Sequence, residues 1–219
     1  VLAAGPPGSG STTTLNALAR HLDTGARCLL AVEEGAPATA ADRFRAIMDQ
    51  DPDVILVDTI ADRETAAAAV RAAEAGHLVL GGVSAGDAVR AILKLRELRV
   101  EPFQLDSTLQ AVLAQRRVRR LCPECREPLQ ARGSVSALLG FDPGAVVYAP
   151  VGCEACGSTG FAGETGVFEA IHADAALRRL INDGGDGAII SSHAFLNAPN
   201  LGSAARALVR GGVTTPEEA

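Results

Sequence analysis

The sequence predicts an α/β protein whose helices pack on a mainly parallel sheet, and three observations support this fold class. The first half of the 219-residue chain alternates short apolar runs with helical patterns, which is typical of parallel strands joined by crossover helices. Hydrophobic residues make up 47% of the chain but aromatic residues only 3%, so the core must consist mainly of Ala, Val, Leu and Ile. The 23 glycines suit close packing of helices against such a sheet.

The individual elements follow from these patterns in chain order. An apolar strand leads into a Gly-rich loop and a helix, and a later helix ends where Gly76 offers a suitable C-terminal residue. Ile92 and Leu95 mark one face of another helix. The segment Leu105–Val118 is also expected to be helical. The expected strands are 1–4, 27–32, 54–57 and 77–82, the other expected helices are 12–21, 39–49, 63–75 and 87–98, and the chain after Phe168 is expected to be helical with an interruption at 183–187.

Charge and hydropathy exclude some classes of protein. A net charge of −6 argues against a nucleic-acid binder, because such domains usually carry a basic field. The basic stretch from Arg116 to Arg120 has no interleaved aromatics, so we interpret it as a solvated helix end or a subunit contact. No apolar run approaches a membrane span and no signal peptide is evident, so we expect a soluble chain. Because Val1 lies inside an apolar strand pattern, we expect a fragment of a longer protein.

Four of the five cysteines form two CxxC pairs, Cys122/Cys125 and Cys153/Cys156. In a chain without a secretory signal this spacing points to metal before disulfide. Two such turns place four thiolates in a tetrahedron with no open position, which predicts a structural Zn²⁺ site. A disulfide, empty thiol pairs or a redox CxxC are the alternatives. Cys28 stands alone in an apolar run and is expected to be a small core residue.

A Gly-rich segment after the first strand has the spacing of a phosphate-binding P-loop, GxxxxGK[ST], except that Ser11 stands in place of Lys. The missing cation would normally face the β and γ phosphates. The only lysine, Lys94, is expected to be a solvated surface charge. Two interpretations stay open: the loop holds phosphate weakly through its backbone donors and the Thr12 hydroxyl, or it is a structural turn. The candidate nucleotide-binding residues are Gly5, Gly8, Ser9, Gly10, Ser11, Thr12 and Thr13.

Six segments, taken together, extend over nearly the whole chain in a recognisable order. They are GPPGSGSTTTLNAL, DPD followed by VILVDTIADRETA, GHLVLGGVSAGDA, VEPFQLDSTLQAVLAQRRVRRLCPECREP, GCEACGSTGFAGETGVFEAI and the closing GGVTTPEEA. In order and spacing these segments resemble the type II secretion and type IV pilus assembly ATPases. The resemblance implies a RecA-like P-loop core, ATP with Mg²⁺ as ligands, hexameric assembly, and a cytoplasmic position at the bacterial inner membrane.

The departures from the family pattern fall on the chemistry. Thr59 stands where the family carries its Walker B glutamate, and Ser84 replaces the second His of the histidine box. Ala61 stands where an Arg is expected, and the acidic box survives only as Glu33-Glu34. Asp58 is a possible Mg²⁺ ligand, although a polar residue ending a strand is the simpler interpretation. The residues that keep the family's types are Asp51, Pro52, Asp53, Asp62, Glu64, Thr65, Gly76 and His77, and we expect His77 to be a hydrogen-bonded residue between helix and strand rather than a base.

The sequence therefore predicts three segments: a RecA-like P-loop core at 1–118, a tetracysteine zinc-type module at 119–168, and C-terminal helices at 169–219. The leading hypothesis is a non-hydrolysing structural or regulatory subunit, assembled as a homo- or hetero-hexamer with family ATPase subunits and bound to inner-membrane platform proteins. One alternative is a slow ATPase whose missing groups come from Asp58, Glu33, Glu34 or a neighbouring subunit. The other is a plain interaction module. No nucleic-acid partner is expected.

Overall fold

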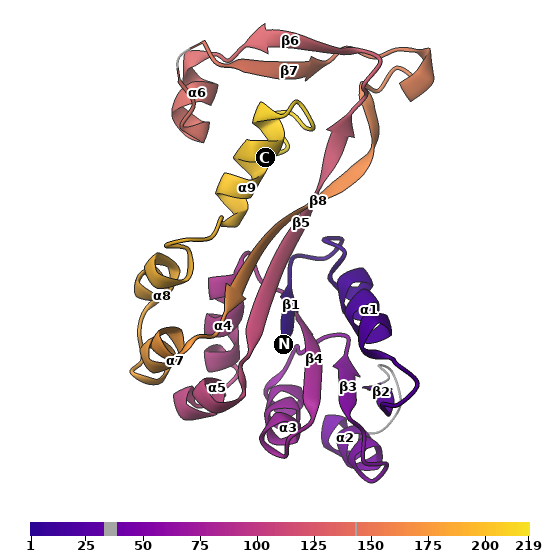
Figure 1. The fold of residues 1–219 in the computed structure, drawn as a ribbon, viewed down its shortest axis with the longest axis vertical. Coiled ribbons are helices and arrows are strands. Elements are labelled where there is room, and N and C mark those ends of the chain that lie inside the picture. The colour runs from indigo at the N-terminus through magenta and orange to yellow at the C-terminus, as the bar shows by residue number, and fades with distance from the viewer. Residues whose placement is uncertain (33–38, 143) are drawn as a thin grey trace. The chain divides into compact units, whose positions relative to one another are not determined.

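The structure is a computed structural model that describes residues 1–32, 39–142 and 144–219 (Figure 1). The chain divides into two compact units, one comprising residues 1–115 and 169–198 and the other residues 116–168 and 199–219. The predicted boundaries 1–118, 119–168 and 169–219 stay a prediction. In the observed division the last predicted segment is shared between the two units, and the strands β5 and β8 have residues in both.

The first unit alternates strands and helices along its N-terminal part, as the sequence predicts. Helix α3 begins at the N-cap Asp62, whose carboxylate accepts a hydrogen bond from the Thr65 N–H, 2.8 Å away. Thr39 and Asp87 cap α2 and α4 in the same way. The elements are β1 (Leu2–Ala4), α1 (Ser11–Leu22), β2 (Leu29–Val32), α2 (Ala40–Met48), β3 (Val54–Val57), α3 (Arg63–Glu74), β4 (Leu78–Val83), α4 (Ala88–Glu97), α5 (Pro102–Thr108), β5 (Ala111–Leu121), β8 (Phe161–His172), α7 (Ala175–Asn182) and α8 (Gly187–Ala194).

The central sheet has the strand order β2-β3-β4-β1-β5-β8 (Figure 1). The pairs β2–β3, β3–β4, β4–β1 and β1–β5 are all parallel. In a parallel sheet the carboxyl ends of the strands meet at one edge, and ligands of α/β proteins bind at that edge. The loops after β1, β3 and β4 therefore share the edge at which the sequence places its candidate nucleotide residues.

Small apolar residues fill the core of the first unit. On α3 the alanines Ala66, Ala68, Ala69 and Ala72 are all buried, and Val70 is buried with them. A second cluster joins α1 to the sheet through Leu15 and Ala19 with partners from β1, β3 and β4. The expected core of Ala, Val, Leu and Ile is confirmed.

The predicted helix Leu105–Val118 is wrong over most of its length. Helix α5 ends at Thr108, and β5 begins at Ala111. Leucines at helical spacing and helix-favouring Ala, Gln and Arg residues suggested one continuous helix, but propensity is a weak prior that tertiary contacts override. Here β1 offers a free edge, and β5 pairs with it in the register Leu2↔Val112 to Ala4↔Ala114.

Two further expectations also fail. The chain stays extended beyond Phe168 because β8 runs to His172, with Glu169 and Ile171 buried and Ala170 exposed. This alternation is the period of a strand. Cys28 is exposed rather than buried, since it precedes β2, the last strand in the order of the sheet.

The second unit is built from a hairpin, a helix and the parts of β5 and β8 that belong to it. Strands β6 and β7 pair antiparallel from Arg126↔Pro150 to Gln130↔Val146. Phe141, Val147 and Val209 form one small core cluster, and Val118, Val167 and Ala205 form another. The remaining elements are β6 (Arg126–Gln130), α6 (Gly133–Leu139), β7 (Val146–Pro150), a 3₁₀ turn η1 (Glu154–Cys156) and α9 (Leu201–Arg210).

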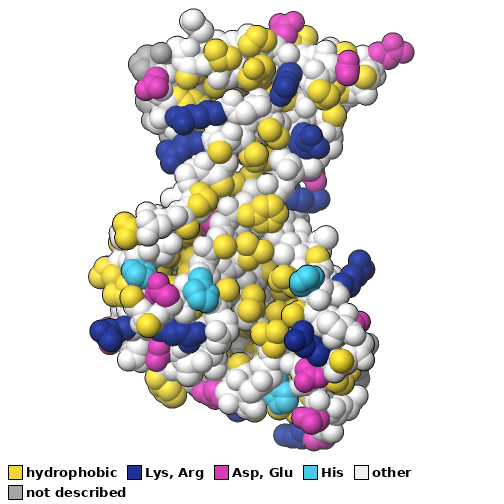
Figure 2. Space-filling view, in the orientation of Figure 1, with side chains coloured by type: hydrophobic (Ala, Val, Ile, Leu, Met, Phe, Trp, Pro, Cys, Tyr) yellow, Lys and Arg dark blue, Asp and Glu magenta, His cyan; other side chains and the backbone are white. Residues whose placement is uncertain are grey.

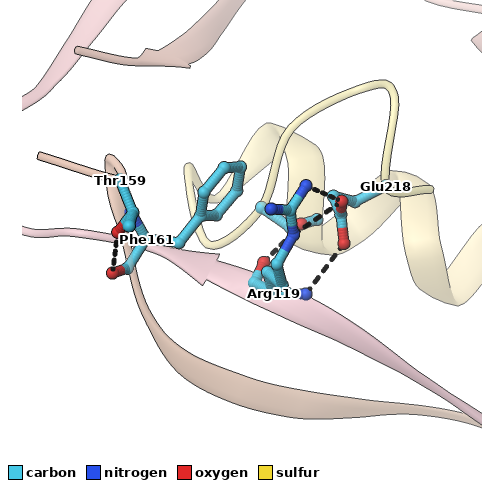
Figure 3. A network of polar contacts seen from close by, with 5 residues as sticks. Arg119, Thr159, Phe161 and Glu218 are labelled. Carbon is cyan, nitrogen blue, oxygen red and sulfur yellow. Dashed lines mark hydrogen bonds and ion pairs between the residues drawn. The ribbon is translucent and has the colours of Figure 1, made fainter. Parts of the chain in front are cut away.

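The C-terminal residues of this unit are tied to β5 by a polar network (Figure 3). The Arg119 guanidinium lies 4.0 Å from the centroid of the Phe161 ring and donates to Glu218 at 2.6 Å. Glu218 also accepts from the Arg119 backbone N–H, and the buried Thr214 donates to the Arg119 carbonyl at 2.7 Å. These contacts hold the family-like closing segment GGVTTPEEA in place.

Among the described helices none is long and apolar enough to cross a lipid bilayer. On the face drawn in Figure 2, basic and acidic side chains are interspersed among hydrophobic ones. The described residues on this face therefore form no continuous basic patch, in keeping with the net charge of −6.

Candidate functional site

The candidate phosphate loop connects β1 to α1 and is shaped by its glycines. Gly8 and Gly10 have φ of 82° and 88°, values that L side chains rarely adopt. Gly5 is required for a different reason: a Cβ there would lie 2.2 Å from the Ser9 Oγ and 2.7 Å from the Gln115 carbonyl oxygen. The loop therefore folds back tightly on its own first residue and on β5.

The amino end of α1 meets the chemical requirements of an anion site. Its N-cap is Gly10 in a left-handed conformation, no side chain of the described residues caps it, and no acidic residue occupies its first turn. The free N–H groups of a helix's first turn carry partial positive charge and favour phosphate. This helix has 12 residues, so its dipole is developed.

The carboxyl edge of the sheet brings the predicted residues Gly5, Ser84 and Asp58 to neighbouring strand ends. The Gly5 N–H donates to Val83 at 3.2 Å, directly before Ser84. A Cβ on Gly82 would lie 2.0 Å from the Asp58 carbonyl oxygen, so the chain leaving β3 passes against the end of β4. The predicted pair Glu33-Glu34 lies outside the described residues.

Ser11, Thr59 and Ser84, three of the residues that the sequence analysis interpreted as departures from the family pattern, occupy this same edge. The described part of the chain shows no side-chain hydrogen bond from Ser11, Thr59 or Ser84, and all three are at least partly exposed. Lys94 lies on α4 and pairs with Glu97 at 3.1 Å, so it does not serve the phosphate loop. Its interpretation as a surface charge is confirmed.

His77 lies at the other edge of the sheet, directly before β4. Its Nδ1 donates to the Pro52 carbonyl oxygen at 2.5 Å, which confirms the hydrogen-bonded position between helix and strand. Other residues that keep the family's types also serve the fold. Asp53 accepts from the Cys28 N–H at 2.8 Å, and Glu64 accepts from the Ala41 N–H at 3.2 Å.

The four paired cysteines form a cluster in the second unit. Their Sγ atoms lie within 4.8 Å of one another, with separations of 3.9 Å for Cys122–Cys153 and 3.8 Å for both Cys125–Cys156 and Cys153–Cys156. Zinc–sulfur bonds of about 2.3 Å in a tetrahedron place the sulfurs about 3.8 Å apart. The donor set and its spacing therefore fit a closed, structural metal site.

Backbone N–H groups surround the sulfurs as they do in thiolate sites. Gly152 donates to the Cys125 Sγ at 3.3 Å, and Cys153 and Gly160 donate to the Cys156 Sγ at 3.3 and 3.2 Å. The Cys153 N–H, assisted by the Gly160 N–H, lowers the pKa of Cys156 to about 6. Burial raises the pKa of Cys125 to about 12. A bound dication would favour the thiolate form of all four sulfurs.

Glycines make the second cysteine turn possible. Gly152 has a φ of 101°, and a Cβ there would lie 2.7 Å from the Ser158 carbonyl oxygen. A Cβ on Gly160 would lie 2.4 Å from the Cβ of Pro150. The two cysteine turns are joined by a hydrogen bond from the Cys122 N–H to the Gly160 carbonyl oxygen at 2.9 Å.

Two buried polar residues next to the phosphate loop edge escaped sequence reasoning. Gln115 is 4% exposed and bonds to the loop, and Glu169 is 3% exposed and accepts from the Ala88 N–H at the start of α4, at 2.6 Å. Both lie on strands that the sequence analysis took for helix. The signal that could have revealed them is a lone polar residue at an inward position of an alternating pattern.

Comparison with known proteins supports the family resemblance. A family described as "Type II/IV secretion system protein" matches residues 1–219. The type II secretion system protein E of Pseudomonas aeruginosa is 41% identical over 236 aligned residues, and the type II secretion system ATPase E of Vibrio cholerae is 37% identical over 238. Each alignment covers 100% of this chain and 47% of the relative, so the chain spans about half the length of these curated relatives.

Solved structures support the fold. The pilus retraction motor PilT with bound ADP superposes with a TM-score of 0.70 at 20% identity, covering 99% of this chain and 59% of that one. The ATPase DotB of Legionella pneumophila also gives 0.70, at 16% identity, with coverages of 99% and 57%. The predicted RecA-like α/β fold with a tetracysteine cluster is confirmed. By its match over all residues and its identity to these relatives, the chain belongs to the type II/IV secretion system protein family.

Proposed function

We propose that this chain is the motor-core region of a secretion or pilus-assembly ATPase subunit that no longer hydrolyses nucleotide. It keeps the fold and the phosphate loop and acts as a structural or regulatory subunit. The proposal includes assembly as a homo- or hetero-hexamer with family ATPase subunits, in the cytoplasm against inner-membrane platform proteins.

The observation that carries the proposal is the pair of residues Ser11 and Thr59. The family pattern has Lys at the first position and Glu at the second. Loss of a charge-assisted contact to phosphate weakens binding by about 1.5–3 kcal/mol, or roughly tenfold to a hundredfold. Loss of a carboxylate that directs the attacking water lowers the rate by roughly 10²–10⁴-fold. One loss weakens nucleotide binding and the other slows hydrolysis, so together they should lower turnover further than either loss alone.

What the loop retains supports ligand binding without turnover. The uncapped amino end of α1 and the left-handed glycines Gly8 and Gly10 preserve the backbone donors of a phosphate site. We expect weak binding of a nucleotide through these groups, with Thr12 as the hydroxyl that would meet Mg²⁺. Of the two interpretations of the loop, this geometry favours a weak phosphate site over a relic turn.

The tetracysteine cluster has a structural role in the proposal. Cys122, Cys125, Cys153 and Cys156 would hold one Zn²⁺, which supplies no open position for a substrate. Its contribution is to fold the second unit and so to keep that unit available as a contact surface. A subunit that acts through its contacts and not through hydrolysis needs this unit to stay folded.

One observation favours the alternative of a slow ATPase. Asp58 directly follows β3 and lies at the carboxyl edge of the sheet, where a Walker B aspartate binds Mg²⁺. With magnesium held there, the backbone donors of the loop could support residual hydrolysis. The two proposed functions differ in the rate of ATP hydrolysis, so a measurement of that rate distinguishes them.

The test is a binding and turnover measurement on the purified protein, alone and with its secretion or pilus partners. Mg-ATP and Mg-ADP affinities are measured by calorimetry, and phosphate release is measured on the assembled particle. We expect weak binding and no release above background. Phosphate release at the rate of an intact family ATPase would overturn the proposal.

Two variants control this measurement. Gly10→Val forces a side chain into a φ of 88° and should abolish any activity that belongs to this loop, which distinguishes it from a contaminating ATPase. Ser11→Lys combined with Thr59→Glu restores two of the missing groups. We expect it to tighten binding more than it restores turnover, because Ala61 and Ser84 also depart and catalytic groups act non-additively.

A further inference from the structure

Gln115 is a buried polar residue that contacts both the phosphate loop and the helix that follows it. Its Nε2 donates to the carbonyl oxygen of Ser9 at 2.9 Å, and its Oε1 accepts from the Thr14 hydroxyl at 2.6 Å. Ser9 belongs to the loop and Thr14 to the first turns of α1. One side chain on β5 therefore bridges the loop and the helix that follows it.

The register of the sheet explains this position. Strand β5 pairs in parallel with β1, and Ala4 lies opposite Ala114. Gln115 is thus level with Gly5, the first residue of the loop, and a Cβ on Gly5 would lie 2.7 Å from the Gln115 carbonyl oxygen. The loop lies directly against this residue's backbone as well as its side chain.

The bond to Ser9 sets the direction of one loop amide. A trans peptide unit is planar, so its C=O and its N–H point in opposite directions. Because the Ser9 carbonyl is held toward Gln115, the Gly10 N–H points away from β5. Gly10 is the N-cap of α1, where the N–H groups favourable to an anion begin.

In the described part of the chain, the buried Ser9 side chain adds no hydrogen bond of its own to the loop. Ser9 is 4% exposed, yet its Oγ has no hydrogen-bond partner among the described residues. Gly8 and Gly10 are glycines with wide conformational freedom, and position 11 lacks the lysine that would order the loop around a phosphate. An unliganded loop of this composition needs a support outside itself.

We propose that Gln115 is the positioning residue of this phosphate loop. It holds the Ser9 carbonyl out of the ligand position and keeps the Gly10 N–H and the first turn of α1 directed at a phosphate group. Gln115 does not touch the ligand. This inference rests on the phosphate site of the proposed function, but it does not depend on whether the chain hydrolyses nucleotide.

The test uses Gln115→Met, which keeps the length of the side chain and removes both hydrogen bonds. Affinity for Mg-ADP and for inorganic phosphate is measured by calorimetry in the native chain and in the Ser11→Lys background, where the restored cation keeps binding measurable. We expect a loss of about tenfold in affinity in the Ser11→Lys background. Thr14→Val removes one of the two bonds and should weaken binding by a smaller factor. Gln130→Met, at an exposed position of β6, is the matched control and should change nothing.

A second readout separates positioning from general stabilisation. Hydrogen exchange of the amides at 8–12 should accelerate in Gln115→Met without ligand, while exchange in α3 and β3 stays as in the native chain. If Gln115→Met in the Ser11→Lys background binds Mg-ADP as its parent does, and Thr14→Val does likewise, the positioning role is refuted. Rapid hydrolysis by the native chain would instead refute the proposed function and leave this inference standing.

Discussion

Removal of the metal from the tetracysteine cluster is expected to unfold the second unit while the first unit stays folded. The reason is the small core of the second unit, whose described residues include two clusters of three or four buried side chains each. Domains of this size often need a metal or disulfides to fold, because they bury too little apolar surface. A chelator removes the metal, and with it the metal–sulfur bonds that would stabilise a unit with so small an apolar core.

The size of the effect follows from the loop that the cluster closes. Cys122 and Cys153 are 31 residues apart in sequence. The chain-entropy relation for a cross-link makes closure of such a loop worth about 4 kcal/mol at 25 °C. The unit has roughly 70–75 residues, and at that size 1 kcal/mol shifts Tm by about 4–8 °C. Loop closure alone therefore predicts a fall in Tm of about 15–30 °C, to which metal–sulfur bonding adds.

Tyr148 provides an assay that is specific to this unit. It is the only tyrosine in a chain without tryptophan, and it lies in β7 with the Arg126 guanidinium 5.1 Å from its ring centroid. Thermal unfolding of zinc-loaded and chelated protein is followed by tyrosine fluorescence and by far-UV circular dichroism together. We expect the fluorescence transition to move to lower temperature, and most of the helical signal to melt where it did before.

Cysteine variants give the matched control. Cys153→Ser should lower the fluorescence transition as chelation does, whereas Cys28→Ser removes an exposed thiol outside the cluster and should have no effect. A Tyr148 transition that stays at one temperature with and without chelator would refute the reasoning. So would a protein that was purified with zinc supplementation and contains no stoichiometric metal.

Three further predictions concern the first unit, each measured by urea denaturation followed by circular dichroism. Gly82→Ala places a Cβ 2.0 Å from the Asp58 carbonyl oxygen, and because backbone cannot move aside cheaply we expect a loss of about 2–3 kcal/mol. Glu169→Ala leaves a buried N–H of α4 without its acceptor and should lower stability by about 2–3 kcal/mol, while Glu97→Ala, at a surface ion pair with Lys94, should cost less than about 1 kcal/mol. The Thr65 N–H lowers the pKa of Asp62 below its usual value. The resulting stabilisation is present above about pH 4 and is lost as the pH falls through the folded-state pKa of Asp62. Asp62→Asn still caps α3, and it should make the free energy of unfolding depend less on pH in this acidic range.

Local patterns predicted the parts of the fold whose cause is local. Strand β3 lies at 54–57 as expected, and α3 begins at Arg63 because Asp62 caps it and an Ala-rich face follows. The cysteine cluster was also predictable, since each CxxC pair lies within a single turn. For β3 and α3 the residues that determine the structure lie within a few positions of one another, whereas the two cysteine pairs are 31 residues apart and were matched by their shared spacing.

The missed features depend on distant partners. Strand β5 is extended because β1 pairs with it, and no residue pattern within 105–118 indicates that β1 is available for pairing. Gln115 bonds to Ser9, 106 residues away in sequence, and Glu169 bonds to Ala88, 81 residues away. Since periodicity detects neighbours along the chain, it cannot reveal a support that the sheet brings in from another strand.

Several residues that match the family's types have a structural role in the fold. Asp62 caps α3, and His77 holds the Pro52 carbonyl, so loss of either would destabilise the chain whether or not it turns over nucleotide. Ser11 and Thr59 have no side-chain hydrogen bond among the described residues. The proposed function places the loss of charge at these two positions. A motor core kept for its shape and its contacts can lose charge there without breaking a side-chain hydrogen bond of the fold.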